Sequence, residues 1–167
     1  MTFDERPRAD ERTTIGPVIE LGHVTDRKPP FRYAAYTRVQ FSETDAQGVV
    51  YYGRYMPYFD LSRTEYHRHL GRIDLGGADF VMRAMTVEYH APARFDDLLE
   101  IFVRAERVGR TSVTFEHAAY RIEDDGGDTL MAAAKQTLVL IDRDTRRPLE
   151  VPAAYREQLA AFEGVAV

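Results

Sequence analysis

Hydrophobic and polar residues follow two regular periods along this chain from residue 31 onward, whereas residues 1–30 follow neither. Alternation with a period of two predicts strands, and recurrence at steps of three and four predicts helices. The predicted strands lie at 33–41, within 78–94, and at 98–108, 111–122 and 129–141. One long helix is predicted at 55–70, where aromatic residues form a single face, and a short helix at 152–162.

The order of these elements predicts an α+β domain. Strands that follow one another through short turns pair antiparallel, and the DDGG run at 124–127 is a hairpin signal. The single long helix then covers one face of the sheet, and the small residues at 132–134 allow it a close approach. The other face and the sheet edges also need cover, so we expect a homodimer or a homotetramer.

Residues 1–30 are predicted to form an irregular N-terminal arm. This stretch holds 11 charged residues and four prolines, and its apolar residues are scattered. Val18–Leu21 is expected to dock on the domain, and Pro29-Pro30 marks the end of the arm. The predicted organisation is therefore an arm at 1–30 and one domain at 31–167.

Composition narrows the function further. A chain of 167 residues fits one domain, and the absence of Cys excludes disulfides, Cys-ligated zinc, iron–sulfur clusters and a thiol nucleophile. A formal net charge of −5 argues against nucleic acid as a partner. No apolar run reaches the ~20 residues of a membrane span, and no basic and apolar leader is visible. We expect a cytoplasmic protein with no membrane partner.

Common cofactor and metal motifs are missing. The sequence contains no phosphate loop, no Gly-x-Gly-x-x-Gly after a strand, no Gly-x-Ser-x-Gly elbow and no His-Glu-x-x-His. His67 and His69 are two residues apart on the predicted helix and point to different sides, so they cannot chelate one ion. We expect no metal and no cofactor.

One segment has a composition unusual for a loop, namely FSETDAQGVVYYGRY at residues 41–55. Its apolar part is expected to fold as a buried ledge under the helix N-terminus, where free N–H groups can bind a developing oxyanion. Asp45, a few residues upstream, could attack the same carbonyl or deprotonate a water. The alternative is structural: Asp45 makes an Asx-type turn in which Gly48 supplies a positive φ.

Three other acids compete with Asp45. Glu65 and Asp60 lie on the predicted helix, and Glu65 is about three turns from the helix N-terminus, so we interpret it as a structural partner of an Arg or of a second subunit. Glu43 either raises the pKa of Asp45 by like-charge repulsion or is solvated. The aromatic stripe from Tyr55 to Tyr66 is interpreted as core.

The run VQFSETDAQGVVYYGRY at 39–55 resembles the signature of hotdog-fold acyl-CoA thioesterases of the 4-hydroxybenzoyl-CoA thioesterase type. That signature is acid-Thr/Cys-Asp-x-x-Gly-x-Val-Tyr/Asn-x-x-x-Tyr, followed by a helix that carries an Arg. The segments VEYHAPARFDD at 87–97 and VLID at 139–142 resemble later parts of the same family. The resemblance covers roughly residues 33–160.

The resemblance implies a hotdog fold, in which an antiparallel sheet wraps around one central helix, and hydrolysis of an acyl-CoA. It places Asp45 at the catalytic aspartate, as nucleophile or general base. It places the backbone N–H of Tyr52, or of Gly53, at the thioester oxygen, and this role survives the change from His that several members carry. Arg110 and Ser112 resemble residues that touch the CoA phosphates in some members, although a solvated turn explains Arg110 equally well.

Two other functions remain open at this point. A hotdog hydratase or dehydratase needs an Asp and a His close in sequence, and no His follows Asp45 before His67. A non-catalytic acyl-CoA-binding protein would bind the same ligands without turnover. The acyl group itself is not readable from the sequence, because strands far apart in the chain build the pocket.

Overall fold

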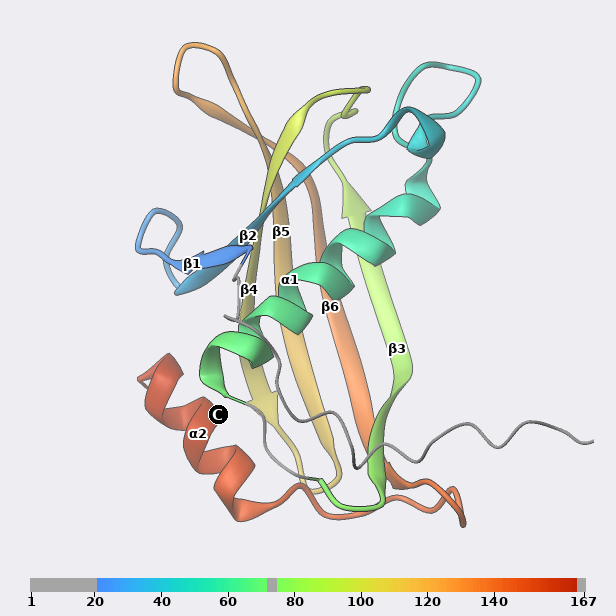
Figure 1. The fold of residues 1–167 in the computed structure, drawn as a ribbon, viewed down its shortest axis with the longest axis vertical. Coiled ribbons are helices and arrows are strands. Elements are labelled where there is room, and N and C mark those ends of the chain that lie inside the picture. The colour runs from blue at the N-terminus through green and yellow to red at the C-terminus, as the bar shows by residue number, and fades with distance from the viewer. Residues whose placement is uncertain (1–20, 72–74, 165–167) are drawn as a thin grey trace, which may run out of the picture.

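The computed structural model describes residues 21–71 and 75–164 as one antiparallel sheet of six strands with helices on one side (Figure 1). The sheet order is β1-β2-β4-β5-β6-β3, and every neighbouring pair is antiparallel. The strands are β1 (Gly22–Val24), β2 (Tyr33–Arg38), β3 (Ala78–Tyr89), β4 (Leu98–Val108), β5 (Ser112–Ile122) and β6 (Asp128–Asp142). The predicted α+β architecture is confirmed.

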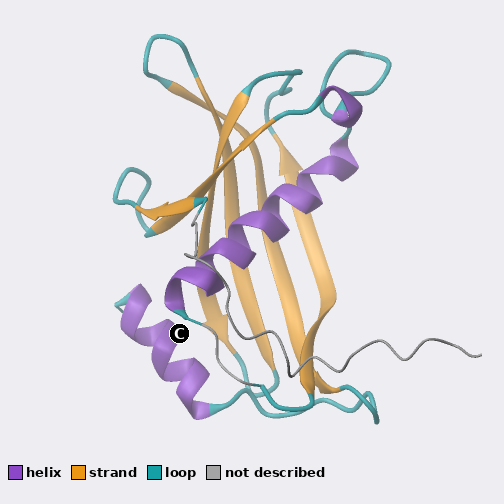
Figure 2. Ribbon diagram, in the orientation of Figure 1, coloured by secondary structure: helices purple, strands orange, loops and turns teal. Residues whose placement is uncertain are grey.

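The long helix α1 (Tyr55–Leu70) crosses one face of the sheet diagonally (Figure 2). Its bounds are those that the three- and four-residue spacing predicted. It ends at Gly71, which adopts a positive φ of 89°, and Arg68 places a cation in the last turn, where the helix dipole favours it. Sequence periodicity therefore fixed both ends of this helix.

The hydrophobic core lies between α1 and the sheet. Tyr55, Phe59 and Tyr66 are almost fully buried, as the aromatic stripe predicted. Tyr55 and Phe59 share one cluster with Ala132 and Ala134 of β6, whose small side chains let the helix approach the strands closely. This packing fixes the position of the N-terminal end of α1.

The strand pairing differs from the expectation in one place. Chain neighbours β4, β5 and β6 pair as expected, but β3 pairs with β6 and lies at the far edge of the sheet. The connection at 90–97 is too long for a tight hairpin, and β2 occupies the free edge of β4 instead. Strand β3 therefore keeps one edge that pairs with no other described strand.

The N-terminal arm also differs from the prediction where the structure describes it. Gly22–Val24 forms strand β1 and pairs with β2, and the backbone N–H of Leu21 donates to Glu65 Oε2 at 2.9 Å. A strand of three residues is too short to show a period, so only its tertiary contacts reveal it. The rest of Val18–Leu21 and the start of the arm lie outside the described residues.

Three shorter elements complete the fold. The single-turn helices η1 (Phe41–Glu43) and η2 (Tyr52–Arg54) flank the loop that joins β2 to α1. The C-terminal helix α2 (Ala153–Glu163) packs beside the end of α1, where Tyr66 donates a hydrogen bond of 2.6 Å to Glu163. Within the described ranges, no helix has the length and apolar character needed to cross a membrane.

A polar pair is buried within this core. Ser62 Oγ on α1 lies 3.2 Å from His117 Nδ1 on β5, and both side chains are almost completely inaccessible. Burial lowers the pKa of His117 to about 3, and burial likewise lowers the pKa of His67 to about 4. Both imidazoles are therefore neutral in the folded protein at pH 7.

These buried imidazoles predict a loss of stability in mild acid. The unfolded chain binds protons at a pKa of about 6.5, so as pH falls the unfolded state is protonated first and is favoured. We expect the free energy of unfolding to fall by about 1.4 kcal/mol per pH unit and per histidine between about pH 6 and 4. Urea unfolding at pH 7 and at pH 5 measures the change. If the free energy of unfolding changes with pH equally in His117→Gln and in the wild type, His117 does not contribute to the loss of stability in acid.

Candidate active site

Asp45 sits in a tight turn between β2 and α1. Its backbone N–H donates to Val49 O at 2.9 Å, its carbonyl accepts from Gly48 N–H at 3.0 Å, and its Oδ1 accepts from Gln47 N–H at 2.7 Å. The bond to Gln47 N–H is an Asx-type turn, and Gly48 supplies the positive φ of 74° that lets the chain turn back. The structural interpretation of this motif is thus correct. It also leaves Asp45 Oδ2 without a hydrogen-bond partner among the described residues.

The rest of the loop is attached to the sheet. Val50 donates its N–H to Ala93 O at 2.8 Å, is only 6% exposed, and belongs to the core beneath α1. The predicted ledge is therefore confirmed for Val50. Tyr51 and Tyr52 differ from that prediction, because they are 43% and 62% exposed and face outward beside the helix start.

Unpaired amides lie where the chain turns into α1. The N–H of Arg54 donates to Tyr51 O at 2.8 Å, and the N–H of Tyr55 donates to Tyr52 O. The N–H groups of Tyr52 and Gly53 precede these bonds, and in the described part of the chain neither meets an acceptor. Such amides at a helix start carry a partial positive charge and can donate hydrogen bonds to a bound oxyanion.

Asp45 and Tyr52 line the same pocket, which has a volume of about 580 Å³. The loop between β2 and α1 supplies one wall, at the top of the view in Figure 1, and the end of β3 supplies the other. Gly53 adjoins Tyr52 in the chain but is not among the residues that line the pocket. The second wall, which the sequence did not predict, consists of Tyr89, His90, Ala91 and Pro92.

The two competing helix acids are engaged in the structure. Glu65 is 2% exposed, pairs with Arg68 and accepts the Leu21 N–H, which confirms its structural role. Asp60 Oδ1 accepts from Arg63 at 2.9 Å and from Gln136 Nε2 at 3.0 Å. Neither carboxylate is among the residues that line the pocket of Asp45.

Glu43 is also engaged in the structure. Its Oε2 accepts from Gln40 N–H at 2.7 Å and from the Tyr58 hydroxyl at 2.6 Å. The first bond closes the single turn of η1, and the second ties that turn to α1. Glu43 therefore holds the start of the loop in place and is absent from the wall of the pocket.

Arg110 and Ser112 lie at the opposite end of the sheet. Their turn joins β4 to β5 at the bottom of Figure 1, beside α2, where Val151 N–H donates to Arg110 O at 2.9 Å. Arg110 also forms an exposed ion pair with Glu150 at 3.1 Å. Within one chain, the structure does not bring these two residues to the pocket of Asp45.

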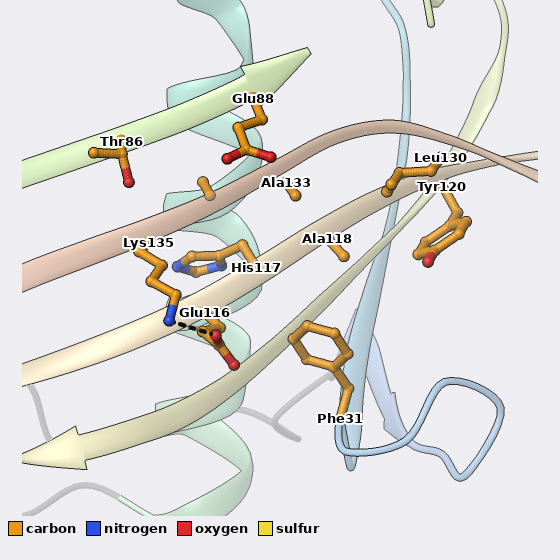
Figure 3. Close-up of a pocket in the computed structure, with 11 residues that line it drawn as sticks. Phe31, Thr86, Glu88, Glu116, His117, Ala118, Tyr120, Leu130, Ala133 and Lys135 are labelled. Carbon is orange, nitrogen blue, oxygen red and sulfur yellow. Dashed lines mark ion pairs between the residues drawn. The ribbon is translucent and has the colours of Figure 1, made fainter. Parts of the chain in front are cut away.

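A second pocket, of about 360 Å³, lies on the face of the sheet turned away from α1 (Figure 3). Phe31 and Tyr120 form part of its apolar wall, and Lys135 Nζ pairs with Glu116 Oε1 at 2.9 Å across it. Both central charges are thus neutralised by each other. Within the described residues, no group of three or more His, Asp or Glu side chains could hold a metal ion.

The geometry of the first pocket suits acyl transfer. Asp45 Oδ2 and the backbone N–H of Tyr52 have no hydrogen-bond partner among the described residues, and both residues line one cavity. A carboxylate in such a place can act on a carbonyl carbon while an N–H donates to the carbonyl oxygen. Tyr51, Tyr55 and Tyr89 are also among the residues that line the pocket. The pocket is therefore a candidate site for acyl transfer.

Comparison with known proteins supports this chemistry. A family model described as the thioesterase superfamily matches residues 47–127. The acyl-CoA thioester hydrolase YbgC of Escherichia coli is 37% identical over 119 residues, which are 69% of this chain and 86% of that protein.

Solved structures show the same fold. A thioesterase superfamily protein from Jannaschia sp. CCS1 superposes with a TM-score of 0.74 at 24% identity, covering 83% of this chain and 87% of that one. A 4-hydroxybenzoyl-CoA thioesterase variant solved with 4-hydroxybenzoyl-CoA gives a TM-score of 0.68 at 24% identity, covering 75% and 96% of the two chains.

Proposed function

The chain belongs to the hotdog acyl-CoA thioesterases of the thioesterase superfamily, and on that premise we propose that it hydrolyses an acyl-CoA to a free acid and CoA in the Asp45 pocket. The observation that carries the proposal is that Asp45 and Tyr52 line one cavity, with an unpartnered carboxylate oxygen and an unpartnered N–H. A cytoplasmic location stays a prediction of the sequence.

Two routes use this arrangement. In the first, Asp45 bonds to the thioester carbon, the carbonyl oxygen takes the negative charge, and the carbon–sulfur bond breaks to release the CoA thiolate. Water then hydrolyses the mixed anhydride. In the second, Asp45 takes a proton from water while the hydroxide adds to the same carbon, and that proton ends on the departing sulfur. The N–H of Tyr52, or of Gly53, stabilises the oxyanion in both routes.

Asp45→Asn tests the role of the acid with little change in shape. We expect kcat for acyl-CoA hydrolysis to fall by about 10²- to 10⁴-fold, because the amide neither attacks nor accepts the proton. Release of free thiol from a panel of acyl-CoAs measures the rate. Asp125→Asn is a matched control, because Asp125 Oδ1 makes the same type of contact, with Gly127 N–H, in an exposed hairpin.

A rate of Asp45→Asn near that of the wild type would overturn the assignment. A single turnover of the wild type in ¹⁸O-labelled water tests the covalent route. Label found in the Asp45 carboxylate indicates that route, because water has then attacked the Asp45 side of the mixed anhydride.

Gly48→Ala tests whether the shape of the turn serves the acid. A side chain at a φ of +74° costs about 1 kcal/mol or more, so both stability and turnover are expected to fall. Gly126→Ala is the matched control, because Gly126 also has a positive φ of 84° and no atom within contact range of an added Cβ. We expect a similar loss of stability there with kcat unchanged. Equal kcat values for the two variants would show that the shape of the Gly48 turn does not matter for catalysis.

We further propose that two copies pair through β3. This edge strand has 12 residues, and its Met82 is 47% exposed. The strand contains no Pro and no Lys, the residues that commonly block pairing at a sheet edge. Antiparallel pairing about a two-fold axis would extend the sheet across both copies. It would also bring the Arg110 and Ser112 end of one copy toward the Asp45 end of the other, where these residues could contact the CoA phosphates.

Met82→Asp tests this assembly. A carboxylate on the paired edge is expected to shift the mass in solution from twice 19.1 kDa, or a higher multiple, toward 19.1 kDa. Sedimentation equilibrium measures the mass. Leu149→Asp is the control, because Leu149 is 38% exposed in the segment between β6 and α2 and is not a residue of β3. A mass that is unchanged in Met82→Asp would place the interface elsewhere.

A further inference from the structure

We propose that Tyr89 is a positioning residue for hydrolysis, because its hydroxyl holds the peptide group between Tyr52 and Gly53, at the two N–H groups proposed to bind the oxyanion. The inference rests on the proposed function, in which the N–H of Tyr52 or Gly53 donates a hydrogen bond to the negatively charged thioester oxygen. Tyr89 is the last residue of β3, and its hydroxyl donates a hydrogen bond of 2.9 Å to Tyr52 O. The sequence placed this tyrosine in the segment at 87–97 and predicted no role for it in the site.

The contact joins the sheet to the start of the helix. Tyr89 is held in the sheet by its register opposite Ala132 of β6, and its ring makes edge contacts with Tyr52 and Tyr55 at centroid distances of 6.4 and 5.6 Å. Tyr51 and Tyr52 are exposed, although Val50 just before them is buried in the core. The hydrogen bond from Tyr89 therefore ties an exposed turn to a fixed strand.

The direction of the Tyr52 carbonyl fixes the direction of the Gly53 N–H. Each peptide unit is planar, so the Tyr52 carbonyl and the Gly53 N–H rotate together, as do the Tyr51 carbonyl and the Tyr52 N–H. Arg54 N–H holds the Tyr51 carbonyl, whereas Tyr55 N–H and the Tyr89 hydroxyl both hold the Tyr52 carbonyl. Both peptide planes that flank the Cα of Tyr52 are thus fixed before a substrate arrives.

Preorganised amides matter most when charge develops. Donors that already point at the position of the oxyanion need no reorganisation during the reaction, and a hydrogen bond to a carbonyl also polarises the N–H of the same peptide. The Tyr89 bond is therefore expected to act more on the transition state than on the ground state, which lowers the barrier without tightening substrate binding.

The hydroxyl of Tyr89, and not its ring, carries this role. Burial raises the pKa of Tyr89, with a further contribution from Tyr52, so the hydroxyl keeps its proton at neutral pH and remains a donor. An aromatic side chain that only lines an acyl pocket would serve equally well as Phe. Tyr89→Phe keeps the ring contacts and removes only the hydrogen bond, so it separates the two roles.

The kinetic test compares kcat and KM for one acyl-CoA substrate. For Tyr89→Phe we expect kcat to fall about 3- to 10-fold with KM within twofold of the wild type, as the loss of one hydrogen bond suggests. Tyr120→Phe is the matched control, because Tyr120 is on the opposite face of the sheet, and both constants should stay within twofold. An unchanged kcat in Tyr89→Phe, or a rise in KM alone, would overturn the inference.

A vibrational measurement separates this inference from the proposed function. An acyl-CoA with a ¹³C-labelled thioester carbonyl is bound to Asp45→Asn, with and without Tyr89→Phe, and the carbonyl stretch is recorded by infrared difference spectroscopy. We expect a lower frequency than in water for Asp45→Asn and a partial return toward the water value when Tyr89→Phe is added. No lowering in Asp45→Asn would refute the oxyanion site itself. A lowering that Tyr89→Phe leaves unchanged would refute only the positioning role.

Discussion

The packing of one aromatic helix face against small residues of the sheet is the constraint on which the rest of this structure depends. Tyr55 and Phe59 reach the sheet only because Ala132 and Ala134 leave space for them. That contact sets where α1 begins, and the beginning of α1 carries the amides of Tyr52 and Gly53. The catalytic proposal is thus a consequence of core packing, because the oxyanion site is a helix end whose position the core determines.

Several buried polar side chains attach peripheral segments of the chain to this core. Glu65 on α1 accepts the N–H of Leu21 and so secures the chain just before β1. Glu163 on α2 accepts from Tyr66 on α1 and from the Ala105 N–H on β4, which fixes the C-terminal helix to both layers. Each carboxylate is buried with partners, as the cost of an unpaired buried charge requires. Glu65 and Glu163 are therefore structural, and Asp45 differs from them in its place on the wall of a pocket beside the start of α1.

The site joins segments that are distant in sequence. The loop after β2 contributes Asp45, the start of α1 contributes Tyr52, and the end of β3 contributes Tyr89. Because β3 is also the free edge of the sheet, the wall that orients the helix start is the same element that is available to a second copy. Catalysis and assembly, as proposed, then depend on one strand.

The sequence by itself determined the elements with a strong period and the turn that holds Asp45. Helix α1 has the bounds that its spacing predicted, β4 likewise, and the Asp45 turn is visible because Asp and Gly have local conformational requirements. Only the tertiary structure decided the partner of β3, the existence of β1 and the contact of Tyr89 with Tyr52. These features produce no hydrophobic period in the sequence, because they depend on which surfaces meet when the helix packs on the sheet. They are a strand pairing, a strand of three residues and a contact across 37 positions.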